Sequence, residues 1–344
     1  MLKRLALLLG ATAVALAFVA CGDDDGSLTP LSTGTAGTLS TPAGTATPRE
    51  LKQVTVGSIP ILIGAPFFVG IEKGYFAQEG LNLKLERVSG DPDMLVQTAA
   101  GNFDIGSGGM GAGVFNAAAA AIQGGREVPF EVVAPLHNEK PPVTTPLVVS
   151  KARYDSGELT KVSDLKGKKV SIKARGGLEY WLQRALQSGG LSFGDVTVVT
   201  VPFPDVAAAL KNKSIDAAML GEPFTTLGED NGLVQVLTEN FVNGEQPTAV
   251  YWNRDWARKN PELAAGFLRA YLKAVADLEN GGWTDPAVIT ILEKYTQVPA
   301  DVIRRSARPY NDPSGKLNLE SLRRQEEFFK AQGLLTYDGQ LDYS

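Results

Sequence analysis

The chain has 344 residues, of which 44% are hydrophobic and 21% charged, the balance expected of one or two ordinary globular domains. A formal net charge of -5 without any Lys/Arg-rich block excludes the electrostatic footprint of a nucleic-acid-binding protein. One cysteine and one histidine are too few for Cys/His zinc sites, disulfide frameworks or Cys–His nucleophile pairs. We therefore expect no nucleic-acid partner, no metal ion and no cofactor.

Residues 1–20 have the pattern of a secretion signal. Lys3 and Arg4 precede an apolar run at 5–17 that is too short for a comfortable membrane span. The Phe-Val-Ala-Cys that follows resembles a bacterial lipobox ending at Cys21, with phenylalanine where leucine is usual. We expect cleavage before Cys21 and lipidation of that residue. The alternative is an ordinary signal peptide with an incidental cysteine.

Residues 21–50 are expected to form a flexible tether. From Gly22 to Pro48 the chain is almost wholly Gly, Asp, Ser, Thr, Ala and Pro, with scattered leucines. Such a segment buries too little apolar surface to offset the entropy of ordering it. It would hold a folded part away from a membrane surface.

The rest of the chain alternates strand and helix patterns. The hydrophobic periodicity predicts strands at 53–58, 81–88, 103–106, 131–136 and 145–150, with helices at 67–76, 93–100 and 114–122. After Ser150 the alternation restarts, with strands at 169–172, 196–201 and 215–219, helices at 178–188 and 206–211, and an amphipathic helix at 261–280. Repeated βα units predict an α/β fold with mainly parallel sheets.

Four sequence blocks then occur in a recognisable order. They are Gly70-Ile71-Glu72-Lys73-Gly74-Tyr75-Phe76 with Glu79-Gly80-Leu81, residues 99–106 (Ala-Ala-Gly-Asn-Phe-Asp-Ile-Gly), residues 163–170 (Ser-Asp-Leu-Lys-Gly-Lys-Lys-Val), and residues 214–218 (Ser-Ile-Asp-Ala-Ala) with Glu222-Pro223. Together they resemble the periplasmic solute-binding proteins of the nitrate, sulfonate/taurine and thiamine-pyrimidine-precursor group of ABC importers, which includes riboflavin binders. The likeness covers most of residues 51 to about 280. Most of the motif residues fit helix ends, caps and strand entries, so they indicate architecture more than a binding site.

This resemblance implies a two-lobe periplasmic binding protein of type II. Residues 51–148 plus 248–344 would form lobe 1 and residues 151–245 lobe 2, joined by two crossover strands. The carboxyl ends of parallel strands and the amino ends of helices converge, so ligand contacts are expected in the βα loops. The candidates are Phe67, Phe68, Gly90, Asp91, Gly108, Gly109, Met110 and Asn138 in lobe 1, Arg175, Gly176, Tyr180, Phe203 and Glu222 in lobe 2, and Trp252 just past the second crossover.

Residues 174–177 (Ala-Arg-Gly-Gly) follow a predicted strand and open a helix, so they can cradle an acceptor or an anion with backbone N–H groups and one guanidinium. Arg175 fits a solvated loop charge equally well. On the helix that follows, Trp181 belongs to the apolar stripe and is assigned to packing, whereas Tyr180 points to the cleft or to solvent. Aromatic side chains at the other positions suit stacking on a planar ring, although each alone also fits a core position.

Two further patterns are set aside. Residues 106–111 satisfy G-x-G-x-x-G, but they are not in the first βα turn, and Glu131 precedes its strand where a dinucleotide site needs the acid at the strand's end. We interpret them as a close-packed turn. His137 has no accompanying nucleophile motif and is interpreted as structural or as a ligand contact.

The function that these observations favour is non-enzymatic capture of a small-molecule solute. We expect a monomeric lipoprotein, in the periplasm or on the outer face of the cell membrane, that delivers solute to an ABC permease and its ATPase. Among the candidate residues in the βα loops, Arg175 is the only cation, whereas aromatic and small residues are plentiful. This favours a planar heterocycle as the solute, riboflavin first or a vitamin or pyrimidine precursor. Anions of the sulfonate, taurine or nitrate type are the alternative, and a ligand-sensing subunit of a signalling receptor is an alternative of another class.

Overall fold

The computed structural model describes residues 50–88 and 91–343. The expected leader, Cys21 and most of the tether lie outside the described residues, as does Gly90. Asp91 is described only by its backbone. None of the described helices combines the length and the apolarity that a membrane span requires.

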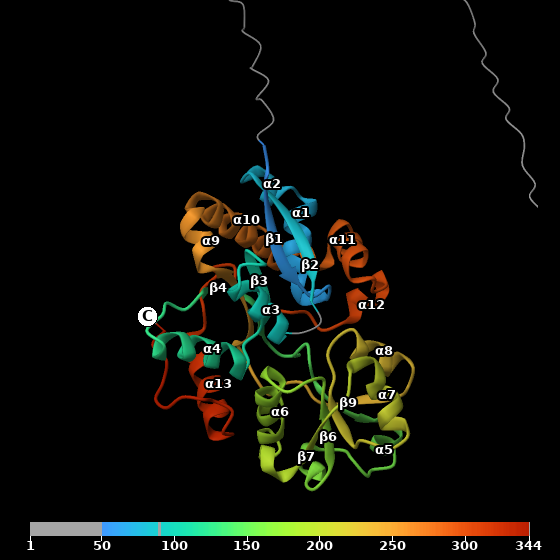
Figure 1. Cartoon of the computed structure of the whole chain (residues 1–344). Coiled ribbons are helices and arrows are strands. Elements are labelled where there is room, and N and C mark those ends of the chain that lie inside the picture. The colour runs from blue at the N-terminus through green and yellow to red at the C-terminus, as the bar shows by residue number, and fades with distance from the viewer. Residues whose placement is uncertain (1–49, 89–90, 344) are drawn as a thin grey trace, which may run out of the picture. The chain divides into compact units, whose positions relative to one another are not determined.

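Two five-stranded sheets organise the described chain (Figure 1). The first has the strand order β2-β1-β3-β10-β4 and the second the order β7-β6-β8-β5-β9. The strands are β1 (Lys52–Ser58), β2 (Leu81–Arg87), β3 (Ile105–Gly109), β4 (Phe130–Glu139), β5 (Leu147–Ser150), β6 (Lys169–Ile172), β7 (Thr197–Thr200), β8 (Ala217–Met219), β9 (Val234–Thr238) and β10 (Glu245–Asn253). This confirms the expected α/β class with two sheets.

Both sheets share one pairing scheme. In the first, β1 pairs parallel with β2 and β3, and β10 runs antiparallel to β3 and β4. In the second, β6 pairs parallel with β7 and β8, and β5 runs antiparallel to β8 and β9. Each sheet is thus half parallel, which refines the expected mainly parallel arrangement. The antiparallel pairs arise where the chain enters or leaves a sheet on its way to the other one.

Helices flank both sheets. They are α1 (Ala65–Glu72), α2 (Tyr75–Gln78), α3 (Asp91–Ala99), α4 (Ala112–Gln123), α5 (Lys151–Asp155), α6 (Gly177–Gln187), α7 (Phe203–Lys211), α8 (Phe224–Asp230), α9 (Arg254–Lys259), α10 (Pro261–Glu279), α11 (Pro286–Thr296), α12 (Ala300–Arg305) and α13 (Leu319–Ala331), with 3-10 turns at Leu62–Gly64, Val162–Leu165, Phe193–Asp195 and Gly282–Thr284. The predicted helix 67–76 is divided into α1 and α2 because Gly74 adopts a φ of 70°, a left-handed conformation that favours glycine.

The chain passes between the sheets twice, through segments 140–146 and 239–244. The two segments are hydrogen-bonded to each other's ends, from Val143 N to Glu239 O at 3.0 Å and from Gly244 N to Glu139 O at 2.7 Å. We call residues 50–139 plus 245–343 lobe 1, 147–238 lobe 2, and the two connecting segments the crossings. The switch at each crossing falls a few residues before the limits expected from the sequence, since β5 already belongs to the second sheet and β10 begins at Glu245.

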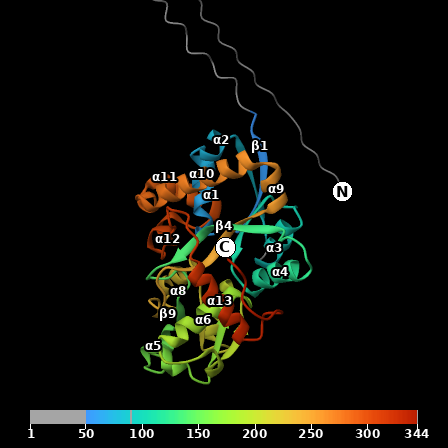
Figure 2. The same cartoon turned by 90° about the vertical axis from the view of Figure 1, so that its left-hand side faces the viewer.

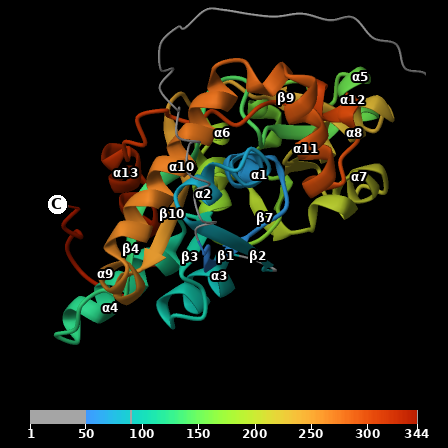
Figure 3. The same ribbon diagram turned by 90° about the horizontal axis from the view of Figure 1, so that it is seen from above.

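The core of lobe 1 forms where α1 and α2 lie beside α10 (Figures 2 and 3). Phe67 and Phe76 pack on Phe267 of α10, with ring centroids 6.3 and 5.6 Å apart. All three rings are almost completely buried, together with Val54 and Val56 of β1. Apolar and polar residues alternate along β1, so its apolar side chains lie on one face of the sheet. These helices cover that face.

The C-terminal helix α13 also contacts lobe 2, although it belongs to the lobe 1 part of the chain. It lies beside α6 (Figure 2). The rings of Phe328 and Tyr180 are 5.6 Å apart there, in an edge-on arrangement. Phe329, next along α13, packs on Phe115 of α4 with centroids 6.0 Å apart. A single helix therefore ties the two lobes together near the crossings.

The aromatic core of lobe 1 predicts a stability effect. Replacing Phe267 with Ala removes a fully buried ring on which Phe67 and Phe76 pack, and we expect the free energy of unfolding to fall by about 3–5 kcal/mol. Phe267→Leu retains most of the volume and should cost less than about 1.5 kcal/mol. Denaturant unfolding of residues 50–344 measures both; equal losses for the two variants would contradict this packing account.

Candidate functional site

A cavity of about 150 Å³ lies between the two lobes. Both lobes contribute to its wall, and the crossings contribute to it as well. The lining residues are Ile59, Ile61, Leu62, Ile63, Gly109, His137, Glu139, Pro247, Thr248, Ala307 and Pro309 from lobe 1, Val143, Thr144, Thr145 and Phe241 from the crossings, and Lys173, Ala174, Arg175, Gly177, Leu178, Trp181, Phe203, Gly221 and Glu222 from lobe 2.

The position of the cavity follows from the sheet topology. Residues 59–63 follow β1, Gly109 ends β3, residues 173–175 follow β6, and residues 221–222 come shortly after β8. These are the carboxyl ends of parallel strands, where an open α/β sheet leaves a crevice. Helices α6 and α7 begin at the same edge, so their free amino-terminal N–H groups lie near the cavity.

Four of the residues predicted from the sequence line the cavity. They are Gly109, Arg175, Phe203 and Glu222. Gly176 is adjacent to the lining residue Gly177 and comes close to lobe 1, because a Cβ placed on Gly111 would lie 3.5 Å from the Gly176 Cα and 3.2 Å from the Gly177 nitrogen. The lobes therefore meet there through backbone, with glycine on both sides.

The other candidates lie elsewhere, and packing explains why. Phe67 is in the lobe 1 core, Phe68 stacks on Tyr295 with centroids 4.6 Å apart, and Met110 is 2% exposed within the hydrophobic core. Trp252 donates from Nε1 to Glu131 at 3.2 Å, outside the cavity.

Asn138 and Gly108 also lie outside the cavity lining. The backbone of Asn138 forms a two-way bridge with Tyr310, from Asn138 N to Tyr310 O at 2.7 Å and back at 3.2 Å. Gly108 pairs with Ala249 inside the first sheet. Gly90 is outside the described residues, and the side chain of Asp91 is not described.

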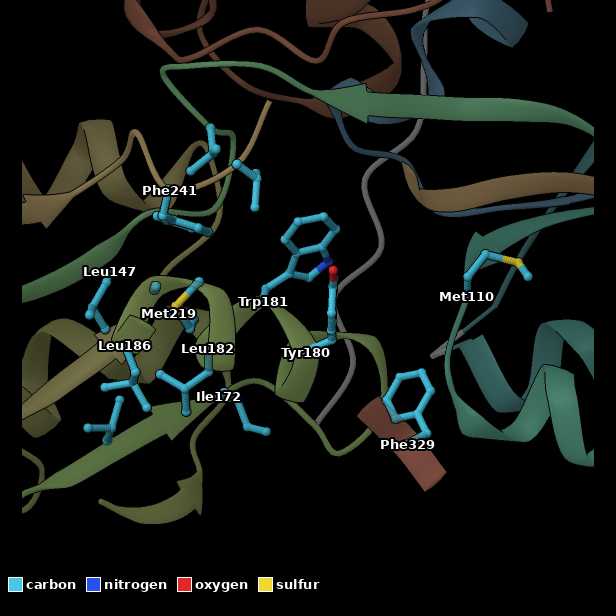
Figure 4. Close-up of a cluster of buried hydrophobic side chains, with 14 of the residues drawn as sticks. Met110, Leu147, Ile172, Tyr180, Trp181, Leu182, Leu186, Met219, Phe241 and Phe329 are labelled. Carbon is cyan, nitrogen blue, oxygen red and sulfur yellow. The ribbon is translucent and has the colours of Figure 1, made fainter. Parts of the chain in front are cut away.

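The helical pattern did not predict the environment of Tyr180, whereas Trp181 is packed in the hydrophobic core as expected and lines the cavity as well. The Tyr180 hydroxyl donates to Glu245 Oε1 at 3.3 Å, and burial, followed by the nearby Glu245 charge, raises the pKa of Tyr180 to about 12. Trp181 is 5% exposed and lines the cavity. Figure 4 shows its indole pointing away from Leu182 and Leu186, which face the lobe 2 core.

Sequence reasoning missed the crossings as a source of site residues. These residues, Val143, Thr144, Thr145 and Phe241, lie in segments without regular structure, although Thr145 was expected to begin a strand, and ligand contacts were expected only in the βα loops. The one feature of the sequence that could have indicated them is that the first crossing lies between the two predicted series of βα units. Together with Trp181 and Phe203, Phe241 gives the cavity wall three aromatic side chains.

The positive charge at the cavity is small. Arg175 donates from Nη1 to Glu179 Oε1 at 2.6 Å, and Glu179 also accepts from Gly176 N at 3.0 Å, so the guanidinium is already paired at the start of α6. Lys173 has no ion-pair partner within the part of the chain that the structure describes, and its ammonium lies 5.7 Å from the centroid of Phe203. The lining cations Lys173 and Arg175 are matched in number by the lining carboxylates Glu139 and Glu222.

Glu222 joins the lobes rather than leaving its carboxylate free. Its Oε1 accepts from Ala307 N of lobe 1 at 3.1 Å, and its Oε2 accepts from Thr226 N and Oγ1 of lobe 2 at 3.2 and 2.9 Å. Beside it, the hydroxyls of Thr226 and Ser306 are 3.2 Å apart. On the outer surface Arg305 of lobe 1 pairs with Asp230 of lobe 2. We call these contacts the lobe latch.

Among the described residues there is no cluster of three or more His, Cys, Asp or Glu side chains that could hold a metal ion. The cavity therefore offers aromatic and aliphatic walls, a few hydrogen-bonding groups and backbone N–H groups. Such a site can hold a small molecule when the lobes meet. Two α/β lobes that enclose a cavity at their strand ends define a protein of the periplasmic solute-binding class.

Comparison with known proteins agrees with this class. Residues 47–290 match the model of the NMT1-like family, and the chain belongs to that family. It is 26% identical over 324 residues to the nitrate/nitrite binding protein NrtA of Synechococcus elongatus, covering 86% of this chain and 70% of that protein. It is 29% identical over 252 residues to the riboflavin-binding protein RibY of Chloroflexus aurantiacus, covering 72% and 68%.

Among solved structures, the chain is similar in fold to the periplasmic aliphatic sulphonate binding protein SsuA of Escherichia coli. The TM-score is 0.67 at 21% identity, and the match covers 83% of this chain and 94% of that one. The resemblance inferred from the four sequence blocks is thereby confirmed, as is the periplasmic binding protein fold.

The lobe latch yields a testable prediction. Glu222→Gln replaces the charged hydrogen bond that Ala307 N donates across the lobes with a neutral one of about half the strength, so the open arrangement should become more populated. Small-angle scattering of residues 50–344 should then give a larger radius of gyration than for the unaltered chain. Asp230→Asn breaks only an exposed pair worth about 0.2–1 kcal/mol and should have the smaller effect. Identical scattering from all three proteins would contradict the latch.

Proposed function

We propose that this chain is the solute-binding component of an ABC-type importer and that it captures a small, planar, uncharged heterocycle between its lobes. Lobe closure around the solute would create the form that docks on the permease, while the ATPase acts on the other side of the membrane. The relatives' names support the binding role, because they are binding proteins for nitrate/nitrite and for riboflavin.

The observation that carries the choice of solute is the composition of the cavity wall. Trp181, Phe203 and Phe241 give flat apolar surface, and Ile59 to Ile63 add aliphatic surface opposite. A nitrate or sulfonate ion needs concentrated positive charge to replace its hydration. Here Arg175 is already paired with Glu179. The remaining lining cation, Lys173, shares the cavity wall with the carboxylates of Glu139 and Glu222. A neutral ring that stacks on an aromatic face fits this wall better than a small anion does.

The volume narrows the class further. An apolar cavity of roughly 150 Å³ holds one benzene-sized ring, and the cavity between the lobes has about that volume. A monocyclic pyrimidine precursor of a vitamin fits the lobe arrangement described here. Riboflavin, with three fused rings, requires the lobes to stand further apart, and it remains the most informative probe because its own fluorescence reports stacking.

A binding measurement tests this proposal. Two solutes are tested with residues 50–344 at micromolar concentration. If riboflavin binds, its fluorescence should be quenched. If 4-amino-5-hydroxymethyl-2-methylpyrimidine binds, calorimetric titration should detect the heat of its binding. Trp181→Ala should weaken that binding about tenfold or more, because stacking on an aromatic side chain contributes about 1–3 kcal/mol. Trp256→Ala is the control, since Trp256 packs on Trp252 outside the cavity. Tighter binding of nitrate or taurine than of either heterocycle would contradict the proposal.

We also propose that the protein is a monomeric lipoprotein held at the outer face of the cell membrane. Its support is the sequence around Cys21 and the tether to residue 50, which suit an anchored domain that must reach a permease.

Anchoring is tested with the full-length chain. Expressed in a bacterium that processes lipoproteins, it should incorporate labelled palmitate and fractionate with membranes, whereas Cys21→Ser should lose both properties. Cys21 is the only cysteine, so no second thiol complicates the labelling. Release of the unaltered chain as an unlabelled soluble protein would contradict the anchor.

A further inference from the structure

Glu139 occupies a distinctive position in the cavity. It is the last residue of β4, at the point where the first crossing leaves lobe 1, and it is 4% exposed. It is one of the residues that line the cavity, and its carboxylate accepts from Thr144 N of the first crossing. The candidate residues predicted from the sequence do not include it.

Glu139 accepts three hydrogen bonds from neighbouring groups. The Oε2 atom accepts from Thr144 N at 2.9 Å, and Oε1 accepts from the Thr144 hydroxyl and lies 3.3 Å from Nε2 of His137. An ionised carboxylate only accepts hydrogen bonds, so this contact assigns a proton to Nε2. The Thr248 hydroxyl accepts from His137 N at 3.2 Å and lies 2.7 Å from Nδ1, and either atom of that second contact can be the donor.

This network leaves the carboxylate incompletely compensated. An ionised carboxylate offers about four acceptor positions, and three donors reach Glu139. Within the described chain, no lysine or arginine lies within ion-pair distance of it, and its one charge-capable partner is His137. A buried carboxylate without a cationic partner is costly unless every acceptor position is used.

We propose that Glu139 is the residue that selects the solute, by accepting a hydrogen bond from an N–H group of the molecule in the cavity. The proposal rests on the proposed function and specifies its substrate class: a ring or chain that presents an amide, imide or amino donor. A solute with acceptors only, such as nitrate, would place a negative charge against this carboxylate and be rejected. His137 acts as a positioning residue that holds the Glu139 carboxylate in place.

The test is calorimetric titration of four probes into residues 50–344 and into its Glu139→Gln variant. Riboflavin, 4-amino-5-hydroxymethyl-2-methylpyrimidine and taurine carry N–H donors, and nitrate has none. Glutamine keeps the shape of the side chain but removes the charge, so each donor-bearing probe that binds should weaken about tenfold, the loss expected when a charged hydrogen bond becomes a neutral one. Nitrate should bind the variant no more weakly than the unaltered protein.

Glu131→Gln is the matched control, because Glu131 is on the same strand but exposed and outside the cavity. Thermal unfolding of both variants separates a binding effect from loss of the fold. Equal affinity of the unaltered protein and Glu139→Gln for the donor-bearing probes would overturn the role of Glu139 while leaving the solute-binding function intact. Binding of nitrate alone, or of none of the four probes at millimolar concentration, would contradict the proposed substrate class and this inference with it.

Discussion

The site depends on one constraint: the chain crosses between the sheets twice, and the two crossings lie side by side. The hydrogen bonds from Val143 to Glu239 and from Gly244 to Glu139 hold them together at one end of the cavity. Each lobe then presents its strand ends to the other across a shared crevice, because both sheets have the same pairing scheme. Residues of both lobes line the cavity, so a solute held there would contact both lobes at once.

In the proposed function, some residues around the cavity hold its walls in place and others contact the solute. Glu222 accepts hydrogen bonds from Ala307 and Thr226, and Arg175 forms an ion pair with Glu179. These two residues therefore hold the cavity walls in place. Trp181 and Phe241 offer surface to a ring. The two charges of Arg175 and Glu222 therefore have protein partners, which is the basis for proposing an uncharged solute.

Much of the fold could be predicted from the sequence, because β1, β6, α4 and α10 are locally amphipathic and were expected within a few residues of their observed limits. The burial of Tyr180 and the contact of Trp181 with the cavity could not. Local periodicity assumes that a helix has one buried face, but α6 is covered on a second side by α13, which comes from about 140 residues further along the chain. Phe67 and Phe68 were misplaced for a similar reason, since α10 and α11 enclose α1 on the side away from the sheet.

The central claim, that the cavity between the lobes holds a small uncharged planar solute, is tested most directly by identifying the molecule that the protein carries from its own cell. Native mass spectrometry of the chain purified from its natural host, followed by release and fragmentation of whatever remains bound, gives that identity. The account predicts one nitrogen-containing aromatic molecule per chain, at lower occupancy in the Trp181→Ala variant. Recovery of a sulfonate, nitrate or another small anion in its place would contradict it.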